Sequence, residues 1–209
     1  MNIYRCTLLA LLIASSNAVI GADDSQKLAL LLQPIQSMSA NFTQQLFDID
    51  GTELESFQGV FELAKPGKML WHVRQPLEQQ LVSDGNILWI YDPDLEQVVI
   101  ESFAEKMKST PIALFNGEVT GLDQRYLITL KGTGSDTELF TLTPKDPESL
   151  FSQIDISFKS SAPESIGVTD TFDQRTLVTF DGLILNPVLD TSIFSFTIPP
   201  QVDVINNVP

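Results

Sequence analysis

Apolar and polar residues alternate along most of this chain, and this two-residue period is the feature that most limits the fold. Met38, Ala40 and Phe42 alternate with polar neighbours. The same spacing recurs in two later runs, which comprise Phe57, Gly59, Phe61 and Leu63, and then Met69, Trp71 and Val73. Successive side chains of a β-strand point to opposite faces of the sheet, so each run predicts a strand with one buried face.

Turn-forming residues separate the candidate strands. "DIDG" at 48–51 is a hairpin signal, and "KPG", "SDG", "DPD", "KGTGSD", "PKDP" and "FDQ" lie between later runs. Further strands are expected at Gln80–Ser83, Asn86–Tyr91, Gln97–Glu101, Gln124–Lys131, Glu138–Thr143, Gln153–Ser160, Glu164–Asp170, Arg175–Phe180 and Phe194–Ile198. Roughly eleven short strands joined by local turns predict a mainly β protein with an antiparallel meander.

The segment that precedes the first strand has a helical pattern. Asp24–Ser25 supplies a candidate N-cap, and apolar residues recur at helical spacing from Leu28 to Ile35. Pro34 is expected to end this helix, because proline lacks the backbone N–H that a helix interior needs.

A second helical signal is "STPIALFNG", residues 109–117. Thr110 is the expected N-cap, Pro111 occupies the first helical position, and Gly117 ends the helix. A further short turn is expected near Asp190–Ser192. Helices this short are not stable alone, so they must pack against the sheet.

The large predicted sheet must have its second face covered, closed or solvated. Several strands are apolar on both faces, as in residues 87–91, whereas the helical segments are few, short and apolar. A curved sheet with a hollow that is capped by helices satisfies these observations and encloses an apolar cavity. A fully packed barrel core is the alternative, and the residue pattern leaves both open.

Residues 1–22 have the order of a secretory signal peptide: a positive charge at Arg5, the apolar run "CTLLALLIA", and then small and polar residues. Cleavage after Ala18 or after Ala22 fits the sequence. The apolar run is too short for a stable membrane span. We therefore expect one exported domain, residues 23–209.

Residues that commonly carry catalysis are scarce. Cys6 is the one cysteine and lies in the leader, which excludes disulfides, zinc–thiolate sites and thiol nucleophiles from the mature protein. His72 is the one histidine and is expected to face solvent or a partner. A "GxSxG" nucleophile motif does not occur. We therefore expect no enzymatic activity, no metal and no cofactor.

Three weaker signals admit other functions. "GTGSD" at 132–136 has phosphate-loop glycines but lacks the following Lys-Ser/Thr, so a hairpin turn is favoured. "DIDGTELE" at 48–55 lacks both end ligands of a calcium loop. Glu53 and Glu55 could serve a glycosidase, although such pairs arise by chance among 27 acidic residues.

The chain has 27 acidic and 12 basic residues, a formal net charge of −15. Such a protein is repelled by nucleic acid and by anionic lipid headgroups, so neither is an expected partner, and we expect no stable membrane association. The acidity can also simply keep an exported protein in solution.

Four segments resemble the LolA-type periplasmic lipoprotein carriers of Gram-negative bacteria. They are "SMSANFTQ" (37–44), "GVFELAKPGKMLWHVRQPLEQQLVSDGNILWIYDPDLEQV" (59–98), "TPIALF" (110–115) and "FSFTIPPQVDV" (194–204). The resemblance covers essentially the whole mature chain in the same order. Residues 117–187 match only as strands and turns.

The resemblance implies an unclosed antiparallel β-barrel with α-helical lids over a hydrophobic cavity. It implies a monomeric periplasmic chaperone that takes triacylated outer-membrane lipoproteins from an inner-membrane ABC-type lipoprotein-releasing complex. The chaperone would pass them to an outer-membrane acceptor lipoprotein. The acceptor shares the fold but needs a lipid-bearing cysteine after its signal, whereas Cys6 precedes the apolar run.

The resemblance also implies which residues hold the acyl chains. The expected site comprises Leu28, Leu32, Met69, Trp71, Ile112 and Phe115. Lys65 stands where the family usually has an arginine that bonds lid carbonyls. Lysine has one ammonium group in place of a planar five-donor fork, so a weaker latch is expected. Trp89 is expected to be structural.

Overall fold

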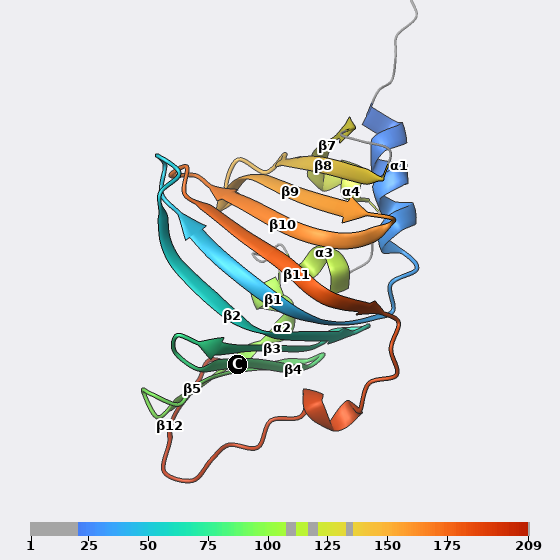
Figure 1. Cartoon of the computed structure of the whole chain (residues 1–209). Coiled ribbons are helices and arrows are strands. Elements are labelled where there is room, and N and C mark those ends of the chain that lie inside the picture. The colour runs from blue at the N-terminus through green and yellow to red at the C-terminus, as the bar shows by residue number, and fades with distance from the viewer. Residues whose placement is uncertain (1–20, 108–111, 117–120, 133–135, 209) are drawn as a thin grey trace, which may run out of the picture.

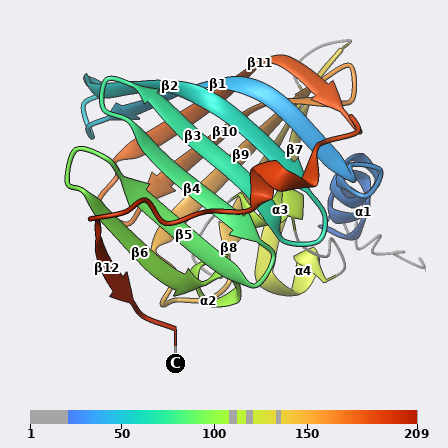
Figure 2. The ribbon, with the colours of Figure 1, turned by 90° about the horizontal axis from the view of Figure 1, so that it is seen from below.

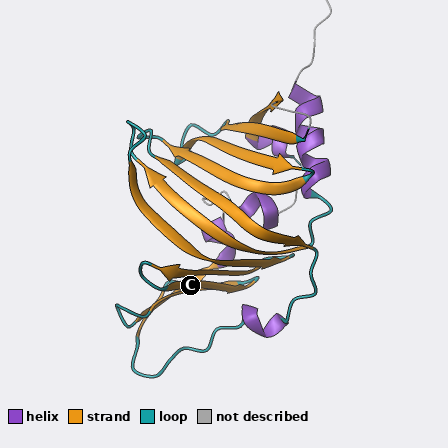
Figure 3. Cartoon of the chain, viewed as in Figure 1, coloured by secondary structure: helices purple, strands orange, loops and turns teal. Residues whose placement is uncertain are grey.

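The structure is a computed structural model that describes residues 21–107, 112–116, 121–132 and 136–208. One curved 12-stranded sheet forms most of the molecule, in the order β12-β6-β5-β4-β3-β2-β1-β11-β10-β9-β8-β7. The short helices between β6 and β7 lie on its concave side, and the N-terminal helix lies at one end of the sheet (Figures 1 and 3). The expected fold class, a mainly β protein with an unclosed sheet and short helices, is therefore confirmed.

Two antiparallel meanders build the sheet. The first contains β1 (Ser37–Phe47), β2 (Glu53–Ala64), β3 (Lys68–Gln75), β4 (Gln79–Asp84), β5 (Ile87–Asp92) and β6 (Gln97–Ser102). The second contains β7 (Tyr126–Gly132), β8 (Thr137–Pro144), β9 (Phe151–Lys159), β10 (Ala162–Asp170) and β11 (Arg175–Leu185). Pairing of β1 with β11 joins the two halves, and this long-range contact curves the sheet around one interior.

The alternation seen in the sequence decides which face is buried. Met38, Ala40 and Phe42 of β1 are all buried, as are Phe61 and Leu63 of β2. Cross-strand partners share a face, and the register pairs Met38 with Leu63 and Ala40 with Phe61. The inward positions thus form continuous apolar rows across neighbouring strands.

The N-terminal helix α1 (Gly21–Leu32) ends before Pro34, as expected. It begins earlier than predicted, so Asp24–Ser25 is not its N-cap. The Asp24 carboxylate instead accepts a hydrogen bond from the backbone N–H of Leu130 at 2.9 Å, which fastens α1 to β7. Residues 1–20 lie outside the described residues, so the signal peptide and its cleavage site stay predictions.

Three short helices follow: α2 (Phe103–Met107), α3 (Ala113–Asn116) and α4 (Leu122–Arg125). The predicted helix at 109–117 is found as α3, while its predicted caps Thr110, Pro111 and Gly117 lie outside the described residues. The sequence did not predict α2 or α4. The strand predicted from Gln124 starts only at Tyr126, because α4 occupies the preceding positions.

The strand predicted at Phe194–Ile198 is wrong. Asp190 caps a 3-10 turn, η1 (Thr191–Phe194), by accepting the N–H of Ser192 at 2.9 Å, and the chain then runs without ladder pairing. The Phe196 ring lies 5.5 Å from the Tyr91 ring, and the following "IPP" supplies two residues without an N–H. Side-chain packing, not a ladder, therefore holds this segment. Figure 2 shows the segment crossing the outer face of the sheet.

The chain ends in β12 (Asp203–Asn206), which the sequence did not predict. It pairs with β6 in parallel, with Asp203 opposite Gln97. Residues 203–206 are all exposed, so this strand has no buried face that would give a two-residue apolar period.

Candidate functional site

A cavity of about 370 Å³ lies inside the curved sheet. Strands β1 to β5 form one wall and β10 and β11 form the other, while Lys106 of α2 and Ile112 also contribute. The lining residues are Gln44, Phe57, Met69, Trp71, Val73, Gln79, Leu81, Leu88, Lys106, Ile112, Ile166, Val168, Thr176 and Val178. The surface is predominantly apolar, as in sites that take hydrophobic ligands.

Cross-strand register explains how residues far apart in sequence meet at this cavity. Gln44 pairs with Phe57 on one side and with Val178 on the other. Val178 in turn pairs with Ile166. These four side chains form one inward row across β2, β1, β11 and β10, so a single row supplies both walls.

An aromatic cluster connects the cavity wall to the helix α3. The Trp71 ring stacks on Phe42 with centroids 3.9 Å apart, and it lies 5.5 Å from Phe61. Phe61 and Phe180 are 5.7 Å apart, and Phe180 meets Phe115 of α3 edge-on at 6.3 Å. Movement of α3 would therefore change the packing behind Trp71.

The expected acyl-chain residues fall into two groups. Met69, Trp71 and Ile112 line the cavity. Leu28, Leu32 and Phe115 do not line it and are 0 % exposed, within the packed part of the interior. The interior is thus hollow at the cavity and filled beneath α1 and α3, so the core is not fully packed.

Lys65 reaches the end of α1. Its Nζ donates to the carbonyl oxygen of Leu32 at 3.3 Å, and its backbone N–H donates to Gln36 at 2.8 Å. A cation is favoured at a helix C-terminus, where carbonyls lack intrahelical partners. Burial lowers the pKa of Lys65, since the charged form loses part of its hydration.

Five hairpin turns of the described chain lie at one end of the sheet, which we call the turn rim: residues 48–52, 76–78, 93–96, 145–150 and 171–174. The register fixes this, since Phe47 at the end of β1 faces Glu53 and Arg175, the first residues of β2 and β11. In Figure 1 the tips of β1–β2 and β10–β11 lie on the left, opposite α1. Gln79 and Thr176, beside these turns, line the cavity, which places one end of the cavity at the turn rim.

Each turn of the rim carries one large, well-exposed apolar residue. These are Ile49 (68 %), Leu77 (65 %), Leu95 (68 %), Leu150 (64 %) and Phe172 (80 %). In four turns an aspartate accepts backbone N–H groups of the turn; Asp170, for example, accepts those of Phe172 at 2.8 Å and Gln174 at 2.9 Å. Single exposed apolar residues are ordinary, and here five of them lie along one rim.

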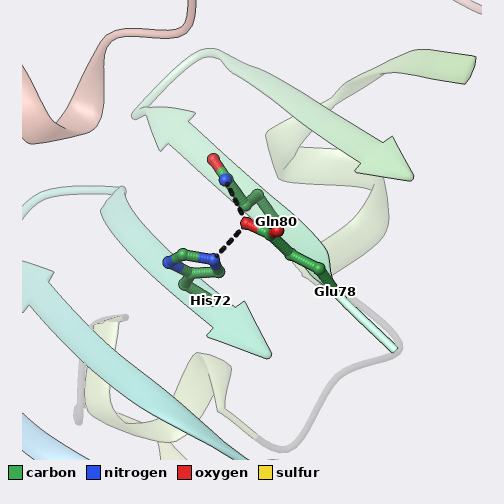
Figure 4. A network of polar contacts seen from close by, with 3 residues as sticks. All are labelled: His72, Glu78 and Gln80. Carbon is green, nitrogen blue, oxygen red and sulfur yellow. Dashed lines mark hydrogen bonds and ion pairs between the residues drawn. The ribbon is translucent and has the colours of Figure 1, made fainter. Parts of the chain in front are cut away.

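His72 lies on the outer face of β3. Its Nε2 is 2.8 Å from Glu78 Oε1, which also accepts the side-chain N–H of Gln80 at 3.1 Å (Figure 4). The hydrogen bond with His72 is the main cause that lowers the pKa of Glu78, followed by that with Gln80. This network points away from the cavity and belongs to the surface of the sheet.

Sequence reasoning did not include most of the cavity wall among the candidate residues. Phe57 and Val73 share the predicted inward faces, so the alternation carried a signal for them. Ile166, Val168 and Val178 lie within 117–187, where the family resemblance is confined to strands and turns. Trp89 stacks on Phe196 on the outer face and does not line the cavity.

Within the described parts of the chain, no helix has the length and apolar character needed to cross a membrane.

Structures of other proteins share this fold. An uncharacterised conserved protein from Thermus thermophilus superposes with a TM-score of 0.56 at 11 % identity, covering 88 % of this chain and 99 % of that one. MucB superposes with a TM-score of 0.50 at 14 % identity, covering 88 % of this chain and 66 % of that one. At these identities the likeness concerns the fold alone.

Sequence comparison is more specific. The family model described as "Outer membrane lipoprotein carrier protein LolA" matches residues 33–197. The chain is 39 % identical to an outer-membrane lipoprotein carrier protein of Chromohalobacter salexigens, over 87 % of this chain and 86 % of that protein. It is 37 % identical to one of Pseudomonas aeruginosa, over 98 % and 99 %. The chain therefore belongs to the LolA family of outer membrane lipoprotein carrier proteins.

Proposed function

We propose that this protein is a periplasmic chaperone that binds the acyl chains of triacylated lipoproteins and carries them to the outer membrane. The observation that carries the proposal is the 370 Å³ apolar cavity in a chain of this family. A ligand with long hydrocarbon chains is the class that such a lining binds, because burial of apolar surface drives the association. No step of this function requires catalysis.

The size of the cavity indicates how loading proceeds. An apolar cavity of about 150 Å³ holds one benzene ring. The 370 Å³ observed here thus accommodates on the order of fifteen carbon atoms by the same measure, close to one acyl chain. Three chains require more space, and we infer that α1 and α3 move away from the sheet to provide part of it. Their movement would expose Leu28, Leu32 and Phe115 as additional lining.

Partial burial also makes release possible. Three chains of about fifteen methylenes each, at about 0.8 kcal/mol per methylene, represent roughly 36 kcal/mol if fully dehydrated. This free energy exceeds the limit of about 20 kcal/mol for non-covalent affinities. A carrier that hands over its cargo must therefore gain only part of this free energy when it binds the acyl chains. A cavity that reaches the turn rim and adapts through Met69 meets this requirement.

We propose that Lys65 acts as a latch for α1. It offers one 3.3 Å hydrogen bond to the last carbonyl of the helix, and its charge is partly desolvated. Both features keep the contribution of Lys65 to closure small, in keeping with a lid that opens when cargo enters.

We propose that the turn rim meets the protein partners, which are the inner-membrane ABC-type lipoprotein-releasing complex and the outer-membrane acceptor lipoprotein. Its exposed apolar tips lie among acidic residues such as Asp50, Asp94 and Asp173, which favours a protein surface with basic residues around apolar recesses. The same charge disfavours anionic lipid. Replacing Phe172 by serine is expected to slow cargo release from the inner membrane without changing hydrocarbon binding; equal release rates would remove the rim from this role.

The proposal is tested by adding purified mature protein to spheroplasts and measuring whether an outer-membrane lipoprotein appears in the soluble fraction. Met69→Glu places a carboxylate in the cavity and is expected to abolish release, because an unpaired charge in an apolar site is strongly unfavourable. Leu127→Glu, at a residue 57 % exposed and outside the cavity lining, is the matched control and should act like the wild type. Undiminished release by the folded Met69→Glu variant would refute cargo binding in this cavity.

A further inference from the structure

Two pairs of adjacent glutamines stand near the turn rim, and in each pair the two side chains have different environments. Gln45 and Gln80 point to the outer face, where Gln45 donates to Glu53 at 2.9 Å and Gln80 donates to Glu78 at 3.1 Å (Figure 4). Their neighbours Gln44 and Gln79 point inward and line the cavity.

The inward glutamines have no hydrogen-bond role among the residues that the structure describes. Neither Gln44 nor Gln79 makes a side-chain hydrogen bond to another described residue, and the hydroxyl of Thr176 makes none either. Lys106, the remaining polar residue of the lining, is paired with Glu101 Oε2 at 3.3 Å. All three are half-buried, so their polar atoms remain accessible and can bind a ligand that enters the cavity.

Gln44, Gln79 and Thr176 are also not spread evenly along the strands but gather near one end of the sheet. Thr176 is the second residue of β11, Gln79 is the first of β4, and Gln44 lies three residues before the end of β1. All three are close to the turn rim. Farther from that rim, the inward row at Met69 and Leu88 is apolar where it lines the cavity. The end of the cavity near the turn rim is therefore more polar than the part at Met69 and Leu88.

We propose that Gln44, Gln79 and Thr176 form a polar collar that binds the ester and amide carbonyls at the head of the acylated cargo. This inference rests on the proposed function and adds an orientation to it. A glutamine amide donates two hydrogen bonds and accepts others, so it can bind ester carbonyls and the amide groups of the cargo's first residues. The acyl chains then extend toward Met69 and Leu88, and the folded part of the cargo leaves at the turn rim.

The collar is expected to change the affinity for ligands that have polar carbonyl groups and not the affinity for pure hydrocarbons. The test uses two probes: a synthetic triacylated cysteinyl peptide, and diphenylhexatriene, a hydrocarbon without polar atoms. The variant Gln44→Met/Gln79→Met keeps side-chain length and removes both amides. Its matched control is Gln45→Met/Gln80→Met, which changes the outward glutamines only.

We expect the inward double variant to bind the lipopeptide about tenfold more weakly, the effect of losing two ordinary hydrogen bonds. Its binding of diphenylhexatriene should be unchanged or tighter. The control variant should bind both probes like the wild type. Equal or tighter lipopeptide binding by the inward variant would overturn the collar.

A change in the ligand gives a second measurement that needs no mutation. A lipopeptide whose two ester-linked chains are replaced by ether-linked chains lacks those carbonyls, and wild-type protein should bind it several-fold more weakly. Equal binding of ester and ether probes would also overturn the collar. If the wild type bound neither lipopeptide, the proposed function itself would fail, so the two failures are distinguishable.

Discussion

Phe115 offers a direct test of whether α3 is a separable lid. Its side chain is 0 % exposed and meets Phe180 edge-on at 6.3 Å. Truncation of a buried phenylalanine to alanine ordinarily lowers the free energy of unfolding by about 3–5 kcal/mol. However, α3 spans four residues and is not stable alone, so its place on the sheet depends on contacts such as this one.

If α3 can leave a sheet that stays folded, Phe115→Ala shifts the protein to the open form. The loss of global stability is then limited to the free energy of lid closure, and we expect about 1–2 kcal/mol, which is less than the ordinary cost. The matched control is Phe140→Ala on β8, since Phe140 is also 0 % exposed and meets Phe158 edge-on at 5.9 Å. This control should show the full loss of about 3–5 kcal/mol.

The assay is urea unfolding of both variants together with amide hydrogen exchange resolved by residue. Phe115→Ala should speed exchange in α3 while β1 and β2 retain their protection. It should also raise the association rate of diphenylhexatriene, because the cavity opens more often. A loss as large as that of Phe140→Ala, with uniformly faster exchange, would show that α3 belongs to the cooperative core and would refute a separable lid.

Three further predictions concern single groups. Lys65→Met removes the donor to the last carbonyl of α1 and should speed hydrocarbon dissociation several-fold in stopped-flow measurements, whereas an unchanged rate would exclude a latch. The folded-state pKa of Glu78 lies below its usual value of 4.5. The stabilisation from its bond with His72 is therefore present above pH 4.5 and is lost as the pH falls through the folded-state pKa. The substitution His72→Ala should raise the Glu78 pKa in an NMR titration. Gly59→Ala would bring a Cβ to 2.0 Å from the backbone oxygen of His72 and should lower the unfolding free energy by about 1–3 kcal/mol. The Cβ of Gly132→Ala meets nothing within 4 Å, so this control should be neutral. Similar losses of unfolding free energy for the two variants would contradict the close approach at Gly59.

Local patterns predicted much of the fold, because each strand of the meander has its own alternation and its own turn. The inward positions of β1, β2 and β3 follow from side-chain direction alone, and the end of α1 follows from Pro34. Prediction was wrong where packing replaces local preference: the C-terminal segment alternates like a strand, yet Phe196 holds it against Tyr91 without a ladder.

The candidate site was predicted only in part, for a related reason. Alternation predicts that Met69 turns inward and the family resemblance places Phe115 in a lid, but neither says whether the space opposite these residues is filled. Phe115 meets Phe180, a residue of β11 that approaches only because β1 pairs with β11. Whether an inward side chain meets a filled or a hollow space depends on distances across the interior, and no single stretch of sequence contains the residues from both walls.

The sequence by itself determined the strand alternation, the turn positions, the acidic surface and the family of this protein. Each is a property of neighbouring residues or of their order along the chain. The tertiary structure alone decided where the interior is packed and where it is hollow, and that Gln44 and Gln79 line the hollow part without a side-chain hydrogen bond to another described residue. Empty space is defined by atoms on all of its sides, and folding brings those sides together from positions more than a hundred residues apart, as with Gln44 and Val178.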